Sequence, residues 1–155
     1  MKNVSRVCAI ALAAILCLGA SQDRPTVLFM CPHGAAKSVL ASAYFKRYAQ
    51  ERGLNVRVLS AGTDPDPQVS QKVAEHLTKN GYQLPIDKPR RVRDEEMRNA
   101  DVVVSLGCDL QGLPAPKGKL LKWDDVPAPS ENFSAADEKI RQRVMELIDE
   151  LARKN

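Results

Sequence analysis

The sequence is short of cysteine and histidine, and its charges nearly balance. Four cysteines occur in 155 residues, two of them within the first twenty. The remaining pair, Cys31 and Cys108, is too small a number for a disulfide scaffold. The two histidines, His33 and His76, are not at the spacing of a metal-binding pair, so we expect no metal site. The net charge is only +4, too mild an excess to indicate a nucleic-acid partner. The chain has no internal repeat or low-complexity segment.

The first twenty residues have the layout of a secretory signal peptide. Two basic residues precede an apolar stretch, Val7–Leu18, which is too short to span a bilayer comfortably, and Leu18-Gly19-Ala20 supplies small residues for cleavage. We therefore expect residues 1–20 to be removed and residues 21–155 to form a single domain. The mature protein is expected to be exported, in the periplasm or secreted, without membrane attachment.

Short apolar segments alternate with helical patterns along the rest of the chain. Because the strands are continuous apolar runs, the pattern predicts an α/β fold in which a four-stranded parallel sheet carries helices on both faces, a three-layer sandwich. In such a sheet the ligand site lies at the carboxyl ends of the strands. The expected strands are Val27–Met30, Val56–Leu59, Val102–Leu106 and Leu120–Leu121, and the expected helices span 39–52, follow Asp66-Pro67, span Arg93–Ala100 and begin at Ser134.

The segment from Thr26 to Ser38 carries the clearest chemical signal. An apolar strand ends at Cys31, a loop of small residues follows, and a helical pattern begins at Val39. Backbone amides of such a loop can surround a tetrahedral oxyanion, and the helix N-terminus adds partial positive charge. The same features favour a cysteine thiolate, which is the nucleophilic form. The sequence therefore predicts a nucleophile, Cys31, at the mouth of an oxyanion-binding loop.

Individual loop residues have distinct expected roles. Lys37 supplies a fixed cation, and the Ser38 hydroxyl is placed to donate a hydrogen bond to the thiolate. The small side chains that precede them let the backbone approach a ligand closely. The expected substrate-binding residues are Pro32, His33, Gly34, Ala35, Ala36, Lys37 and Ser38.

These residues resemble a known signature. Cys-x5-Arg-Ser between a strand and a helix marks the low-molecular-weight protein tyrosine phosphatases and the thioredoxin-coupled arsenate reductases that share their fold. Cys31-x5-Lys37-Ser38 matches it except at the arginine, and Cys31-Pro32-His33 is similar to the Cys-x-His opening common among the reductases. Ser60-Ala61-Gly62-Thr63 is similar to the second-strand motif of the family. The resemblance covers essentially all of residues 21–155 and implies the low-molecular-weight phosphatase fold.

Two later segments bring the chain closest to the reductase branch. Val102–Asp109 resembles the strand that carries the second redox cysteine of the reductases, which places Cys108 in that role. Trp123–Pro129 resembles the late loop that carries the general acid. The reductases also use a third cysteine soon after the second, but none lies between Asp109 and Trp123. A relay would therefore end at a Cys31–Cys108 disulfide or pass an arsenic adduct to an external thiol.

The chain departs from the family pattern at two positions. The family arginine grips two oxygens of the oxyanion with a planar fork, whereas Lys37 keeps the charge and loses the bidentate geometry. The general acid is normally an aspartate just before a proline, and Ala128 stands there. Asp124 and Asp125, three or four residues upstream, are the candidates for a substitute acid.

Three functions are compatible with these features. The first is an enzyme in which Cys31 attacks arsenate and Cys108 resolves the adduct, or alternatively a phosphomonoester hydrolase of the tyrosine phosphatase type. The second is a weak or inactive relative that binds an oxyanion or a phosphorylated ligand, as the Lys37 and Ala128 departures favour. The third is an envelope thiol-redox protein using the same cysteine pair. No cofactor is expected beyond an external thiol reductant, and the expected partners are arsenate, phosphate or a phosphorylated substrate and a thiol-redox protein.

Overall fold

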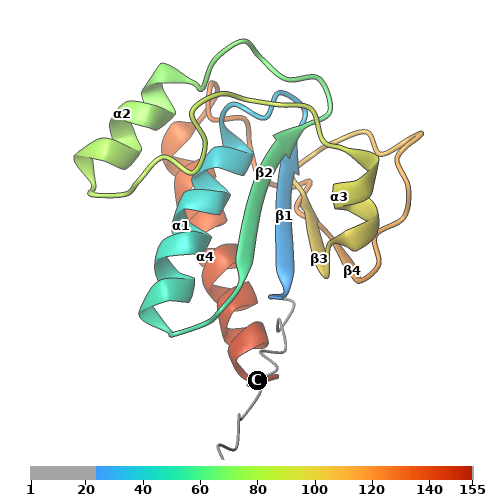
Figure 1. Ribbon diagram of the computed structural model, residues 1–155. Coiled ribbons are helices and arrows are strands. Elements are labelled where there is room, and N and C mark those ends of the chain that lie inside the picture. The colour runs from blue at the N-terminus through green and yellow to red at the C-terminus, as the bar shows by residue number, and fades with distance from the viewer. Residues whose placement is uncertain (1–23, 155) are drawn as a thin grey trace, which may run out of the picture.

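Four parallel strands form one sheet in the order β2-β1-β3-β4 (Figure 1). The computed structural model describes residues 24–154. The expected signal peptide lies outside the described residues, so its removal and the export of the protein stay predictions. Strand β1 lies in the interior of the sheet because its residues are apolar on both faces. The strands are β1 (Thr26–Cys31), β2 (Arg57–Gly62), β3 (Val102–Ser105) and β4 (Lys119–Lys122).

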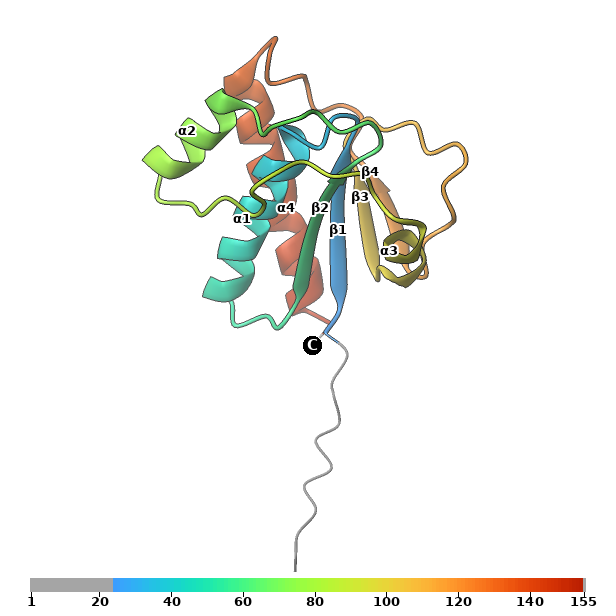
Figure 2. The ribbon, with the colours of Figure 1, turned by 45° about the horizontal axis from the view of Figure 1, so that its top comes forward.

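Helices cover both faces of the sheet, as the sequence predicts. Alternate residues of β1 point in opposite directions, so Val27 and Phe29 join the core beneath α1 and α4, whereas Leu28 and Met30 pack towards α3. Figure 2 shows α1 and α4 on one side of the sheet, with α2 beside α1 and α3 on the opposite side. The helices are α1 (Lys37–Glu51), α2 (Gln71–Lys79), α3 (Asp94–Asn99) and α4 (Phe133–Ala152). Within the described residues, no helix is both long enough and apolar enough to cross a membrane.

Three expected boundaries are wrong, each for an identifiable reason. The second strand was expected to end at Leu59 but continues to Gly62, because Ser60, Ala61 and Gly62 pair with Phe29–Cys31. Helix α2 begins at Gln71 instead of after Asp66-Pro67, because the intervening segment is bonded to another loop, as described below. Helix α4 begins before Ser134, because the Asn132 side chain caps it by accepting a hydrogen bond from Ala135 N–H at 3.0 Å.

His76 has a structural role, as its position beside the apolar face of a helix predicts. Its Nε2 lies 3.1 Å from the hydroxyl of Tyr44 on α1, and that hydroxyl donates to Asp137 on α4. Arg141 completes the cluster through a 2.9 Å hydrogen bond to Asp137. Burial and the Asp137 carboxylate raise the pKa of Tyr44 far above its ordinary range, so its proton stays in place. These contacts join α1, α2 and α4 on the side of α1 away from the sheet.

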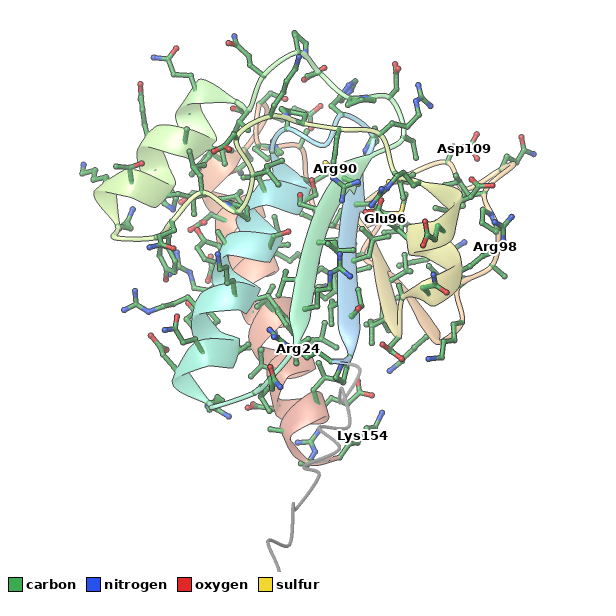
Figure 3. The ribbon with its side chains drawn as sticks, viewed as in Figure 1. Arg24, Arg90, Glu96, Arg98, Asp109 and Lys154 are labelled. Carbon is green, nitrogen blue, oxygen red and sulfur yellow. The ribbon has the colours of Figure 1, made fainter. Side chains whose placement is uncertain are left out.

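A buried carboxylate ties α3 to the segment that precedes it. The side chain of Glu96 is 6% exposed and accepts hydrogen bonds from Arg90 at 2.7 Å and from Arg93 at 3.0 Å (Figure 3). Burial raises the pKa of Glu96, but the two guanidinium groups and the backbone N–H of Arg93 outweigh it and hold this pKa at about 2, against an ordinary 4.5. The ionised carboxylate is therefore the form that stabilises the fold.

We expect the stability of the protein to depend on this ionisation. Because the folded state binds the proton less readily than the unfolded state, the stabilisation is complete above pH 4.5 and is lost as the pH falls towards 2. At neutral pH, Glu96→Gln is expected to lower the free energy of unfolding by about 2 kcal/mol, a value discounted for the exposure of Arg93. Urea unfolding at neutral and acidic pH measures both effects. Equal acid sensitivity in the variant and the wild type would contradict this role of Glu96.

Candidate active site

The loop between β1 and α1, residues 32–36, places Cys31 and Ser38 side by side at the carboxyl edge of the sheet. Cys31 is only 3% exposed, and its thiol donates to the Ser38 hydroxyl across 3.3 Å. Once the thiol ionises, the hydroxyl becomes the donor and stabilises the thiolate. Ser38 is itself fully buried. We call residues 32–36 the oxyanion loop; in Figure 1 it lies at the top of β1.

Two glycines allow the oxyanion loop to pack against the end of β2. Gly34 has φ +61°, and a methyl group there would come within 2.9 Å of the Gly62 nitrogen. A methyl group at Gly62 would in turn come within 2.6 Å of the Gly34 nitrogen. Only residues without a side chain fit at this contact. The Ser60-Ala61-Gly62-Thr63 motif thus acts as the support of the oxyanion loop.

The segment after β2, residues 63–70, fixes the orientation of the loop peptides. The carbonyl of Pro32 accepts from Asp64 N–H at 2.8 Å, that of His33 from Asp66 N–H at 3.0 Å, and that of Ala35 from Ser70 N–H at 3.0 Å. In a planar trans peptide the carbonyl and the following N–H point in opposite directions. The amides of His33 and Ala36, which follow the carbonyls of Pro32 and Ala35, therefore point away from the 63–70 segment, which is the orientation an oxyanion cradle requires. The Gly34 N–H instead donates to the Cys31 carbonyl at 3.3 Å.

The N-terminus of α1 is free to contribute to the same cradle. Its N-cap residue, Ala36, makes no side-chain hydrogen bond, and no acidic residue lies in the first turn. The first amides of α1 are therefore not neutralised by a side chain of the described residues, and a helix N-terminus of this kind attracts anions.

A cavity of about 570 Å³ opens above this cradle. Its walls come from the oxyanion loop, from the 63–70 segment and α2, and from the loop between β4 and α4 (residues 123–132). Seven of the lining residues were not predicted as site residues: Asp66, Ser70, Lys72, Ala128, Pro129, Ser130 and Phe133. The lining residues are Cys31, Pro32, His33, Ala35, Ala36, Lys37, Asp66, Ser70, Lys72, Ala128, Pro129, Ser130 and Phe133.

Asp66 supplies the carboxylate of this cavity. Its Oδ1 lies 3.2 Å from Nδ1 of His33, and both side chains are at least half exposed. The sequence suggests a helix cap for Asp66, because Asp-Pro is a common start of a helix. Only its proximity to His33 in the folded chain could have placed it in the site.

Asp124 and Asp125 do not serve as the acid of this cavity. Neither lines it, whereas Ala128 does. Asp125 is instead paired with Lys139 at 2.6 Å and with Arg143 at 2.8 Å on α4. These cations hold the pKa of Asp125 below its ordinary value, which is the opposite of what a proton donor needs. The expectation of a substitute acid at these positions is therefore corrected.

Cys108 follows the neighbouring strand. Leu106 N–H donates to the Met30 carbonyl at 2.8 Å, so the residues after β3 run beside the end of β1. Cys108 is half-buried, and both it and Cys31 are free thiols. Burial chiefly raises the pKa of Cys108 to about 11, with the nearby Cys31 adding to the effect. Within residues 24–154, no group of three His, Cys, Asp or Glu side chains could hold a metal ion.

Comparisons with known sequences agree with this geometry. The family model described as low molecular weight phosphotyrosine protein phosphatase matches residues 26–117. A Halobacterium salinarum protein named "Putative arsenate reductase" is 31% identical over 127 residues, which cover 79% of this chain and 89% of that protein. The protein-arginine-phosphatase of Bacillus subtilis is 30% identical over 87 residues, 52% of this chain and 54% of that protein.

Solved structures give the same picture. A thioredoxin-dependent arsenate reductase of Corynebacterium glutamicum superposes with a TM-score of 0.76 at 29% identity, over 87% of this chain. The chain spans 65% of the length of that reductase, slightly less than two thirds. A low molecular weight phosphotyrosine phosphatase of Vibrio cholerae superposes with a TM-score of 0.73 over 84% of this chain and 99% of its own, at 20% identity, which is a likeness of fold.

Proposed function

The chain belongs to the low molecular weight phosphotyrosine protein phosphatase family, and from that premise we propose that it reduces arsenate with the thiols of Cys31 and Cys108. The observation that carries the proposal is a pair of free thiols on adjacent strands: Cys31 ends β1 and lines the cavity, and Cys108 follows three residues after the end of β3. A phosphatase needs only the first thiol, whereas a reductase needs both.

The first step uses the oxyanion loop. The Cys31 thiolate attacks the arsenic of arsenate, a sulfur–arsenic bond forms, and one oxygen leaves as water after taking a proton from solvent. The Ser38 hydroxyl stabilises the thiolate before attack. The loop amides stabilise the negative charge on the remaining oxygens.

The second step uses Cys108 and transfers the electrons. The Cys108 thiolate attacks the Cys31 sulfur, a disulfide forms, and the sulfur–arsenic bond breaks with its electron pair remaining on arsenic. As(V) is thereby reduced to As(III), which leaves as arsenite, while the two cysteine sulfurs are oxidised by two electrons. An external dithiol then reduces the disulfide by thiol exchange and restores both thiols.

The test is a single turnover without reductant. The fully reduced protein is mixed with excess arsenate, and both arsenite and remaining thiols are counted. We expect one arsenite per chain together with a Cys31–Cys108 disulfide, identified by mass spectrometry of its peptides. Cys108→Ser is the matched control and is expected to release no arsenite. If the wild type forms no arsenite and both thiols remain free, the proposal is contradicted.

Hydrolysis of a phosphomonoester is the second candidate function. The cavity volume of about 570 Å³ is in the range that accommodates an organic ligand. Phe133 and Pro129 supply an apolar wall for such a group. An organic alcohol also needs a proton when it leaves, and Ala128 cannot supply one, which is why we place this function second.

A further inference from the structure

The Lys37 ammonium contacts two loops beside the cavity that Lys37 lines. Lys37 is the first residue of α1, and its Nζ donates to the carbonyl of Val126 at 3.5 Å. Nζ also lies beside Gly107, so closely that a methyl group on Gly107 would come within 3.3 Å of it. The positive charge therefore stands between the segment after β3 and the loop after β4.

Cys108, the residue after Gly107, lies within the influence of this charge. Burial and Cys31 raise the pKa of Cys108 to about 11, whereas a hydrogen bond with Ser105, a backbone group of Leu106 and the Lys37 ammonium lower it. Lys37 is the positively charged member of the groups that lower the pKa of Cys108. At neutral pH Cys108 is thus mostly a thiol, and only its thiolate attacks a sulfur atom. The second step of the proposed reaction therefore needs a group that stabilises the thiolate of Cys108.

We propose that Lys37 serves the second thiol: its ammonium, held between Gly107 and Val126, stabilises the Cys108 thiolate as this attacks the Cys31 sulfur. This inference rests on the proposed arsenate reduction. A lysine suits the task because its charge is compact and its stem is flexible, whereas an arginine engages an oxyanion through a planar fork. Lys37 also lines the cavity, so its positive charge stands between the substrate site and the segment that carries Cys108.

The reactivity of Cys108 tests this role without any turnover. In the full chain carrying Cys31→Ser, the rate at which iodoacetamide alkylates Cys108 is followed across pH, with each cysteine peptide resolved by mass spectrometry. Adding Lys37→Met is expected to slow alkylation by about threefold at mildly alkaline pH, because the thiolate fraction falls. Adding Lys37→Arg keeps a positive charge and is expected to leave the rate close to that of the Cys31→Ser parent.

Lys72→Met is the matched control, because it removes another positive charge from the lining of the same cavity. It is expected to leave the alkylation of Cys108 unchanged, and circular dichroism checks that every variant is folded. Equal Cys108 alkylation in the Lys37→Met variant and its parent would overturn the inference, as would equal slowing by Lys72→Met. If Lys37→Met slows alkylation but the wild type releases no arsenite, the charge pairing stands and the arsenate assignment fails.

Discussion

Arsenate turnover is expected to fall by about 10⁴-fold or more when Cys31 is replaced by serine. Cys31 is the sulfur that lines the cavity, and it lies next to the buried hydroxyl of Ser38. A serine hydroxyl at this position fits the space but is a far weaker nucleophile than a thiolate, and it cannot take part in a disulfide. Steady-state arsenite release with a dithiol reductant measures the loss.

A measurement of oxyanion binding shows whether the Cys31→Ser variant has lost only the nucleophile or the whole binding site. The amides of the oxyanion loop remain in Cys31→Ser, so phosphate binding by calorimetry is expected to stay within about tenfold of the wild type. Ser38→Ala is the matched variant: it removes the hydroxyl 3.3 Å from the sulfur and is expected to reduce turnover by only about tenfold. Turnover by Cys31→Ser above one part in about a hundred would refute the assignment of Cys31 as nucleophile.

Hydrolysis of aryl phosphates is expected to rise by about 10²-fold in Ala128→Asp. Ala128 lines the same cavity as Cys31 and is half-buried. A carboxylic acid there can donate a proton to the oxygen of a departing phenol, and the wild type has no such group at position 128. The gain is therefore expected to be larger for phenyl phosphate than for p-nitrophenyl phosphate, because nitrophenolate leaves without protonation.

Ala128→Asn is the matched control for this gain. Asparagine has the shape of aspartic acid but no acidic proton, so its rate is expected to stay at the wild-type level. Equal rates in the two variants would mean that position 128 does not face the leaving group. Phosphatase activity of the wild-type site would then require another proton donor, and the His33–Asp66 pair would be the first candidate to test.

The strands and the oxyanion loop could be predicted because their signals are local. The continuous apolar run at Val27–Met30 has no polar face to expose, so the segment must be buried on both sides. Cys31 and Ser38 are seven residues apart, and a strand, a tight loop and the first turn of a helix bring them together. The family resemblance then suggests which chemistry to test at this arrangement.

The residues around the oxyanion loop could not be predicted from the sequence, because they come from distant segments that pack against the loop. Asp66 joins the cavity because the 63–70 segment is hydrogen-bonded to the carbonyls of the oxyanion loop. Asp125 is not a candidate acid because it forms ion pairs with Lys139 and Arg143 on α4. Neither the position of Asp66 nor the ion pairs of Asp125 can be read from the sequence, since each depends on side chains that meet only in the folded protein.

By itself, the sequence determined the α/β fold and the strand–loop–helix unit that places Cys31 beside Ser38, because these depend on hydrophobic periodicity and on local geometry. The tertiary structure alone decided where the charges of the site stand: the ammonium of Lys37 between Gly107 and Val126, and the carboxylate of Asp66 beside His33. Long polar side chains can reach several positions from the same backbone, so their partners are selected by the loops that pack around them.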